Sequence, residues 1–93
     1  MTNFAVYQIG YCIFGVGATP EAARADAAQW MDGGEEAAAD VPMYRRGQFV
    51  DGAVVVMPCS DALATQVMAR GGADSFMEMD GGLCTVEEAG QAS

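Results

Sequence analysis

The sequence predicts a small α+β domain, a two-layer sandwich with two helices on one face of an antiparallel or mixed sheet of four to five strands. Three observations favour this class. Residues 4–14 have the apolar and aromatic composition of a strand, and residues 19–31 have the periodicity and capping signals of a helix. Asp51-Gly52 stands between two β-rich runs, as in a hairpin with a type I′ turn. The expected order is β-α-β-β-α-β-β.

The first strand is expected to be covered on both faces. Apolar residues occupy the odd and the even positions of residues 4–14, which is typical of a central strand. An uninterrupted strand over this segment would span about 36 Å, which is long for a small domain. Gly10 is therefore the expected place for a bulge, a bend or a strand break.

The first helix has signals for both of its ends. Thr19 is a good N-cap residue, Pro20 suits the first helical position, and Gly33-Gly34 ends the helix. A rotation of about 100° per residue places four apolar side chains on one face, which is expected to pack on the core. These side chains are Ala23, Ala27, Trp30 and Met31.

The segment after this helix, residues 35–43, is acidic and rich in alanine, and we expect it to form a surface loop. Strands are expected over residues 44–50 and 53–57, on the two sides of Asp51-Gly52. The second of these strands is apolar throughout and should lie inside the sheet.

The last third of the chain predicts a helix and a second hairpin. Ser60 caps the helix, which runs from Asp61 to about Arg70. Its buried face is expected to comprise Leu63, Ala64, Val67 and Met68. Residues 75–79 and 83–86 then flank an Asp-Gly-Gly turn. The whole chain, residues 1–93, is interpreted as a single domain with a frayed tail at 90–93.

The charge of the chain restricts its partners. Thirteen Asp and Glu residues against four Lys and Arg give a net charge of −9. Such a chain is repelled by nucleic acid and by anionic membranes, so a charged partner is expected to be cationic. The sequence shows neither the basic start of a secretory signal nor an apolar run of about 20 residues. Three widely spaced cysteines are expected to be reduced and buried in a cytoplasmic protein.

Several kinds of chemistry lack their usual residues. The chain has no His and no Lys, so the common general base, the Schiff-base nucleophile and the phosphate-binding ammonium are missing. Cys12, Cys59 and Cys84 do not have the spacing of a zinc site. The glycine-rich turn at residues 15–20 lacks the lysine of a phosphate-binding loop. We therefore expect a protein without enzymatic activity, metal or cofactor.

Two groups of acidic residues carry the functional hypothesis. The first comprises Asp32, Glu35, Glu36 and Asp40. The second lies near the C-terminus and comprises Asp74, Glu78, Asp80, Glu87 and Glu88, of which the first three are expected to bind a partner. One interpretation is a solvated surface that keeps an apolar-rich protein in solution. The other is a surface that imitates the phosphates of nucleic acid and binds a protein groove built to neutralise them.

Five short segments carry a resemblance to a known class of proteins. They are VYQIG (6–10), GATPEA (17–22), DAAQW (26–30), GG (71–72) and LCTVEEA (83–89). Together they resemble small uncharacterised acidic proteins of bacterial phages and plasmids. In size and acidity the chain is also similar to anti-CRISPR proteins, several of which block effector complexes by occupying DNA-binding surfaces.

The resemblance implies an inhibitor that acts in the host bacterial cytoplasm. Its partner would be a basic surface of a host protein complex, specifically a multisubunit CRISPR effector, with no direct contact to nucleic acid. The alternative is a protein-interaction or assembly module, in particular a homodimer formed through an exposed sheet face or through the expected edge strand at residues 44–50.

Overall fold

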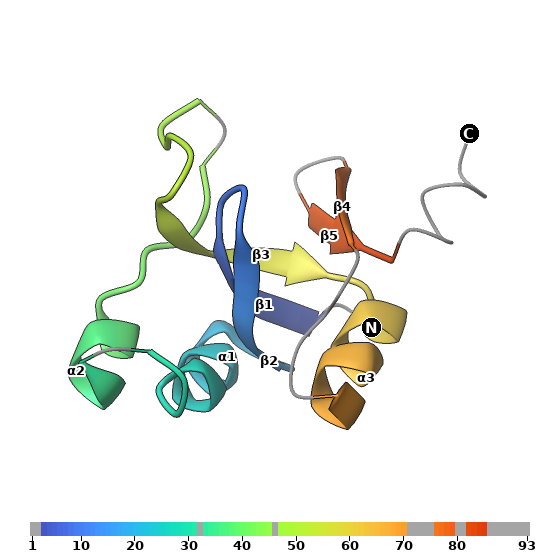
Figure 1. The fold of residues 1–93 in the computed structure, drawn as a ribbon, viewed down its shortest axis with the longest axis horizontal. Coiled ribbons are helices and arrows are strands. Elements are labelled where there is room, and N and C mark those ends of the chain that lie inside the picture. Colours follow the sequence, from blue (N-terminus) through green and yellow to red (C-terminus); the bar gives the residue numbers. More distant parts are fainter. Residues whose placement is uncertain (1–2, 32, 46, 71–75, 80–81, 86–93) are drawn as a thin grey trace.

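The first two strands of the computed structural model form a hairpin (Figure 1), β1 (Asn3–Gln8) and β2 (Cys12–Gly17). The structure describes residues 3–31, 33–45, 47–70, 76–79 and 82–85. The predicted strand break is confirmed, because Gly10 adopts a φ of 82° in the turn, where a residue without a Cβ atom is favoured. The Tyr7 hydroxyl accepts a hydrogen bond of 3.0 Å from the Gly10 N–H group.

The remaining strands complete a mixed sheet. β3 (Val54–Cys59) pairs antiparallel with β1, and it pairs in parallel with β5 (Gly82–Cys84) at Cys59 and Leu83. β4 (Met77–Met79) and β5 form the predicted second hairpin. The sheet order is β2-β1-β3-β5-β4, so the predicted α+β class with a mixed sheet is confirmed.

The described residues form three helices: α1 (Pro20–Ala27), α2 (Gly34–Ala39) and α3 (Asp61–Arg70). α1 and α3 pack on the sheet, and α2 packs on α1. Side chains of Ala5 and Tyr7 join one apolar cluster with α3, while Val6 joins a second cluster with α1. Because neighbouring residues of a strand point to opposite faces, α1 and α3 pack on opposite faces of β1.

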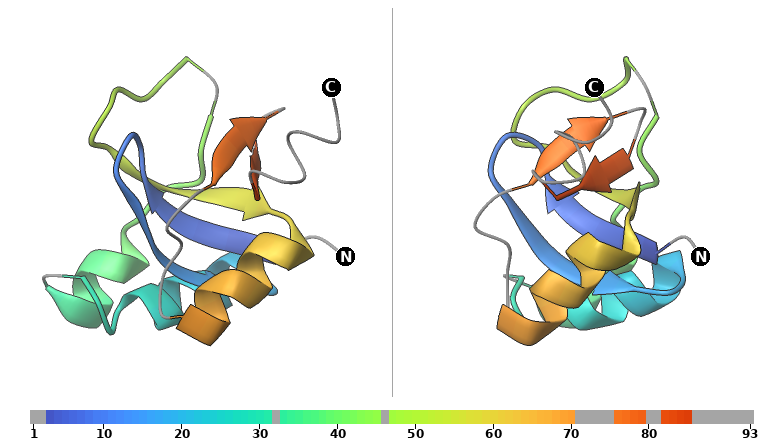
Figure 2. Two further views of the ribbon diagram at one scale, coloured as in Figure 1. Left: turned by 45° about the vertical axis from the view of Figure 1, so that its right-hand side comes forward. Right: turned by 90° about the vertical axis from the view of Figure 1, so that its right-hand side faces the viewer.

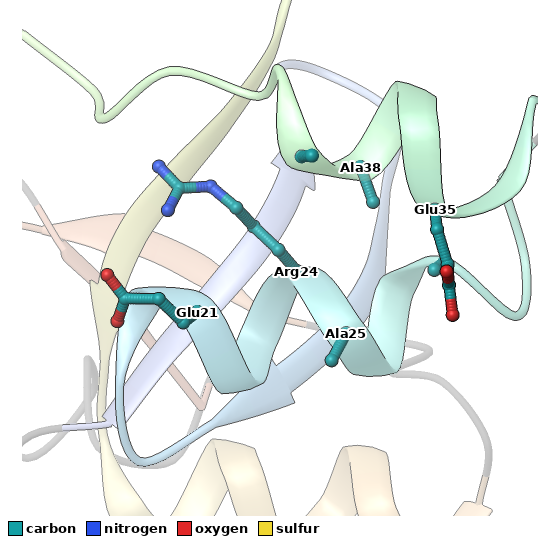
Figure 3. A pocket seen from close by; sticks show the side chains of 7 residues that line it. Glu21, Arg24, Ala25, Glu35 and Ala38 are labelled. Carbon is teal, nitrogen blue, oxygen red and sulfur yellow. The ribbon is translucent and has the colours of Figure 1, made fainter.

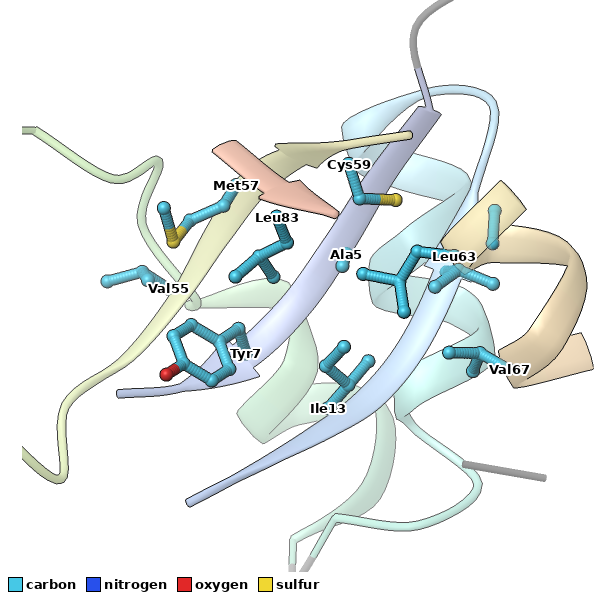
Figure 4. Close-up of a cluster of buried hydrophobic side chains, with 11 residues drawn as sticks. Ala5, Tyr7, Ile13, Val55, Met57, Cys59, Leu63, Val67 and Leu83 are labelled. Carbon is cyan, nitrogen blue, oxygen red and sulfur yellow. The ribbon is translucent and has the colours of Figure 1, made fainter. Parts of the chain in front are cut away.

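This placement differs from the expectation that both helices share one face. β1 and β3 are apolar at both odd and even positions, so each face of the sheet has to be covered by another part of the chain. The larger cluster includes Met57 and Leu63, both 0% exposed, and Val67 of α3 packs beside them (Figure 4). No helix in the described parts of the chain has the length and apolarity needed to cross a bilayer.

The predicted hairpin at Asp51-Gly52 is not formed, and residues 44–45 and 47–50, the described part of the expected strand, are not in a strand. Both edges of β3 are already used: β1 pairs along one, and the chain at Met43 makes a parallel bridge to Val56 on the other. The turn itself exists, with Gly52 at a φ of 91°. It packs on the β1–β2 turn, where the Gly52 N–H group donates to the Ile9 carbonyl oxygen at 2.8 Å.

The start of α1 is fixed by the predicted N-cap. Thr19 has an extended backbone, and its hydroxyl oxygen accepts a hydrogen bond of 3.0 Å from the Ala22 N–H group. Thr19→Ala is expected to lower the free energy of unfolding by about 1 kcal/mol, because that N–H group loses its acceptor. Thr19→Ser keeps the hydroxyl and should lose little. Urea unfolding of the two variants measures the difference, and equal stability of both variants would contradict this role for the cap.

The end of α1 comes earlier than predicted. The helix ends at Ala27, and the Trp30 N–H group bonds to the Ala27 carbonyl oxygen three residues back, at 2.9 Å. This tighter turn rotates Trp30 away from the buried face, and its side chain is 61% exposed. The prediction that Trp30 is buried is therefore wrong, whereas Ala23 and Ala27 are fully buried as predicted.

Candidate functional site

The most acidic element of the described chain is α2, which replaces the surface loop predicted for residues 35–43. Gly33, at a φ of 91°, is the N-cap of α2, which begins at Gly34. Glu35 and Glu36 in its first turn and the alanines that follow favour helix formation. Ala38 is buried and attaches α2 to the protein.

The acidic side chains of α2 point to solvent. Glu35, Glu36 and Asp40 are all exposed. Glu36 and Asp40 are four residues apart, a spacing at which two like charges destabilise a helix. Asp40 also occupies the C-cap, where the helix dipole favours a positive charge. Local stability therefore does not explain the acid at position 40.

A groove of about 330 Å³ separates α2 from α1. Figure 3 shows Glu21 and Glu35 at opposite ends of this groove, with Ala25 and Ala38 between them. Arg24 supplies the positive charge among the lining residues. Its Nε–H group donates a hydrogen bond of 3.0 Å to the Val41 carbonyl oxygen, which ties α1 to the chain beyond α2.

The groove is lined mainly by alanine methyl groups, with the Glu21 and Glu35 carboxylates and the Arg24 guanidinium as its charged groups. We call the exposed carboxylates of Glu35, Glu36 and Asp40, together with this groove, the α2 surface.

The structure brings together only part of the predicted acidic set. Glu35, Glu36 and Asp40 lie on the α2 surface. Glu78 belongs to β4, at the edge of the sheet farthest in strand order from β2, and Figures 1 and 2 show β4 well away from α2. The other predicted residues, Asp32, Asp74 and Asp80, lie outside the described residues, as does the predicted tail at 90–93.

Glu21 and Arg24 contribute to the groove without having been predicted. Their signal in the sequence is weak: an acid and a base three residues apart, followed by alanines at positions 25 and 28 on the same side of the helix. Small side chains on a helix surface permit a close neighbour, but they do not say which segment provides it.

Groups with metal-binding or redox chemistry are not assembled in the described residues. No cluster of three or more His, Cys, Asp or Glu side chains occurs in the ranges the structure describes. Cys59 is buried and Cys84 is half-buried, as expected for small apolar residues. Cys12 is exposed, contrary to prediction, because it begins the edge strand β2.

Comparison with known proteins returned no relatives. The chain matches no protein-family model, and neither the curated proteins nor the solved structures contain a significant match to it.

Proposed function

We propose that this protein is a non-enzymatic inhibitor of the anti-CRISPR type, encoded by a phage or mobile element and acting in the host bacterial cytoplasm. Its α2 surface binds a basic, nucleic-acid-binding surface of a host complex. A multisubunit CRISPR effector is the specific partner. The protein occupies this surface in place of DNA and does not itself contact nucleic acid.

The single observation that carries the proposal is the exposed acid on α2. Glu35, Glu36 and Asp40 stand on one short helix beside a groove, and the negative charge at Asp40 opposes helix stability. Residues that break a local rule without a structural gain are expected at functional positions. Acidic residues spread over the whole surface would keep the protein in solution equally well, so solubility alone does not explain why these three are grouped.

The overall charge supports the same mechanism. At −9 the chain is attracted over several ångströms to a channel lined with arginine and lysine, which raises the rate of encounter. Salt screens this attraction, so binding through the α2 surface should weaken steeply as ionic strength rises. A channel filled in this way no longer admits the phosphates of the target strand.

Co-elution with purified multisubunit CRISPR effectors tests the proposal. The protein is mixed with each effector at about 50 mM salt and at several higher concentrations, and the complex is separated by size-exclusion chromatography. We expect co-elution at low salt with at least one effector and its loss at high salt. Absence of co-elution at low salt with every effector tested would refute the proposed partner.

Charge reversal locates the binding surface. Glu35→Lys/Glu36→Lys should weaken binding to the effector about tenfold or more at low salt, because two attractions become repulsions. Both side chains are exposed, so the fold should be retained. Biolayer interferometry on the immobilised effector measures the dissociation constant.

A pair of single variants separates position from net charge. Glu36→Lys and Asp51→Lys change the net charge equally, and both residues are exposed. Asp51, however, lies in the turn that precedes β3 and not on α2. Glu36→Lys should weaken binding more than Asp51→Lys. Equal losses would show that only the net charge matters and would contradict a role for the α2 surface.

A further inference from the structure

A second hollow, of about 180 Å³, lies where α1, β2 and α3 meet. Its lining combines aromatic, carboxylate and thioether side chains, and comprises Phe14, Asp26, Gln29, Trp30, Val67 and Met68. The α2 surface shares none of these residues with it. The hollow is therefore a separate feature whose chemistry needs its own explanation.

Two large apolar side chains at this hollow are exposed to solvent. Trp30 is 61% exposed and Met68 is 66% exposed, although the sequence pattern predicted that both would be buried. Trp30 is the single tryptophan of the chain. The face of an indole ring is the most favourable aromatic surface for a cation.

Asp26 brings a negative charge to the same hollow. It lines the hollow together with Trp30. Its carboxylate accepts hydrogen bonds from the Val16 N–H group at 3.1 Å and from the Gln29 side-chain amide at 3.4 Å. Both donors are neutral, and a carboxylate has about four acceptor positions. Among the described contacts of Asp26, acceptor capacity therefore remains.

From this combination we propose that the hollow binds an arginine side chain presented by the protein partner. The guanidinium group stacks on Trp30 and donates to the Asp26 carboxylate, while its aliphatic stem lies against Met68. Arginine suits the site better than lysine, because a planar guanidinium can stack and form two parallel hydrogen bonds at once. The identity of the partner rests on the proposed function, but the chemistry of the site does not.

The hydrogen bond from the Val16 N–H group to the Asp26 carboxylate explains why the hollow does not bind a β-strand of another protein. β2 is an edge strand, and an unprotected edge can pair with a strand of another protein. Asp26 already accepts from the Val16 N–H group of this strand. The α3 residues Val67 and Met68 reach the hollow from the other face of the sheet. A strand that paired with β2 at Val16 would have to displace the Asp26 carboxylate.

Titration with a small peptide tests the site without any effector. Acetyl-Gly-Arg-Gly-amide is added to the isolated protein while the indole N–H resonance of Trp30 is followed by NMR. We expect a saturable shift with a dissociation constant on the order of millimolar, as suits one exposed cation–π contact and one ion pair. Acetyl-Gly-Gln-Gly-amide should bind at least about fivefold more weakly. Equal binding of the two peptides, or no saturable shift with the arginine peptide, would overturn the proposal.

Variants at an exposed position give a matched control. Met68→Lys places a cation beside the hollow and should reduce arginine-peptide binding about tenfold, whereas Met68→Gln should reduce it less than threefold. Asp26→Asn retains an acceptor for the Val16 N–H group and should weaken binding about fivefold. Equal losses in the Met68→Lys and Met68→Gln variants, or line broadening that grows with protein concentration, would identify the patch as an apolar interface instead.

The outcome is separable from that of the proposed function. Glu35→Lys/Glu36→Lys should lose effector binding and keep the response of Trp30 to the arginine peptide. Retention of peptide binding without any effector binding would refute the proposed partner alone. Effector binding without a peptide response would refute the arginine site alone.

Discussion

Gly15→Ala is expected to destabilise the protein by about 3 kcal/mol. A Cβ atom at Gly15 would lie 2.8 Å from the Cα atom of Ala27, inside the closest normal carbon contact. At Gly17 a Cβ atom would lie 2.6 Å from the backbone nitrogen of Ala23. The backbone of α1 thus rests directly on β2, and neither can yield without separating the helix from the sheet. Guanidinium chloride unfolding measures the loss.

Gly47→Ala provides the control for glycine substitution as such. Gly47 has a φ of 81°, which strains any other residue, yet no atom lies within 4 Å of its would-be Cβ atom. This variant should lose only about 1 kcal/mol. A loss at Gly15 no greater than that at Gly47 would contradict the close approach of α1 to β2.

Leu63→Ala is expected to have the second large effect, a loss of about 2–5 kcal/mol in the free energy of unfolding. Leu63 is 0% exposed and lies in the cluster that joins α3 to β1 and β3. Its removal would leave a cavity lined by rigid strands, which close around a void poorly. Thermal and denaturant unfolding, monitored by circular dichroism, provide the measurement.

Met68→Ala on the same helix is the matched control. Met68 is 66% exposed, so its truncation should change stability by less than about 0.5 kcal/mol. The two variants also distinguish the observed helix from the predicted one, in which Met68 shared the buried face. A comparable loss of stability in both variants would show that the packed face of α3 is wider than in the structure and includes Met68.

Local signals in the sequence were sufficient for the elements that depend on neighbouring residues. The N-caps Thr19 and Ser60 act as predicted, since the Ser60 hydroxyl accepts a hydrogen bond of 3.2 Å from the Leu63 N–H group. The turn at Gly10 and the hairpin of β4 and β5 also form where expected. Each of these features involves groups only a few residues apart, so the sequence contains nearly all the relevant information.

Features that depend on distant partners were predicted less well. Residues 44–50 have the composition of a strand, but β1, far away in the sequence, pairs along one edge of β3, and Met43 bridges to Val56 on the other. The arrangement of the layers depended in the same way on distant contacts, namely on whether each helix packs against the odd or the even residues of β1. Periodicity gives the buried face of a helix only while the helix continues, and the tighter turn at the end of α1 moved Trp30 to the surface.

The candidate site was predictable in charge but not in shape. Composition indicated a cationic partner, and Glu35, Glu36 and Asp40 were identified as a group. Their helix, the groove beside it and the contribution of Glu21 follow from the packing of α2 on α1. That packing is a tertiary contact between two short alanine-rich segments, whose apolar faces are too small to predict from periodicity.

Competition with target DNA tests the central claim most directly. A fluorescently labelled target duplex is bound to a co-eluting effector, the protein is added, and anisotropy follows the bound DNA. We predict that the protein displaces the duplex competitively, that higher salt weakens the displacement, and that Glu35→Lys/Glu36→Lys displaces about tenfold less well. Simultaneous binding of protein and DNA to the effector, with undiminished DNA affinity, would contradict the account.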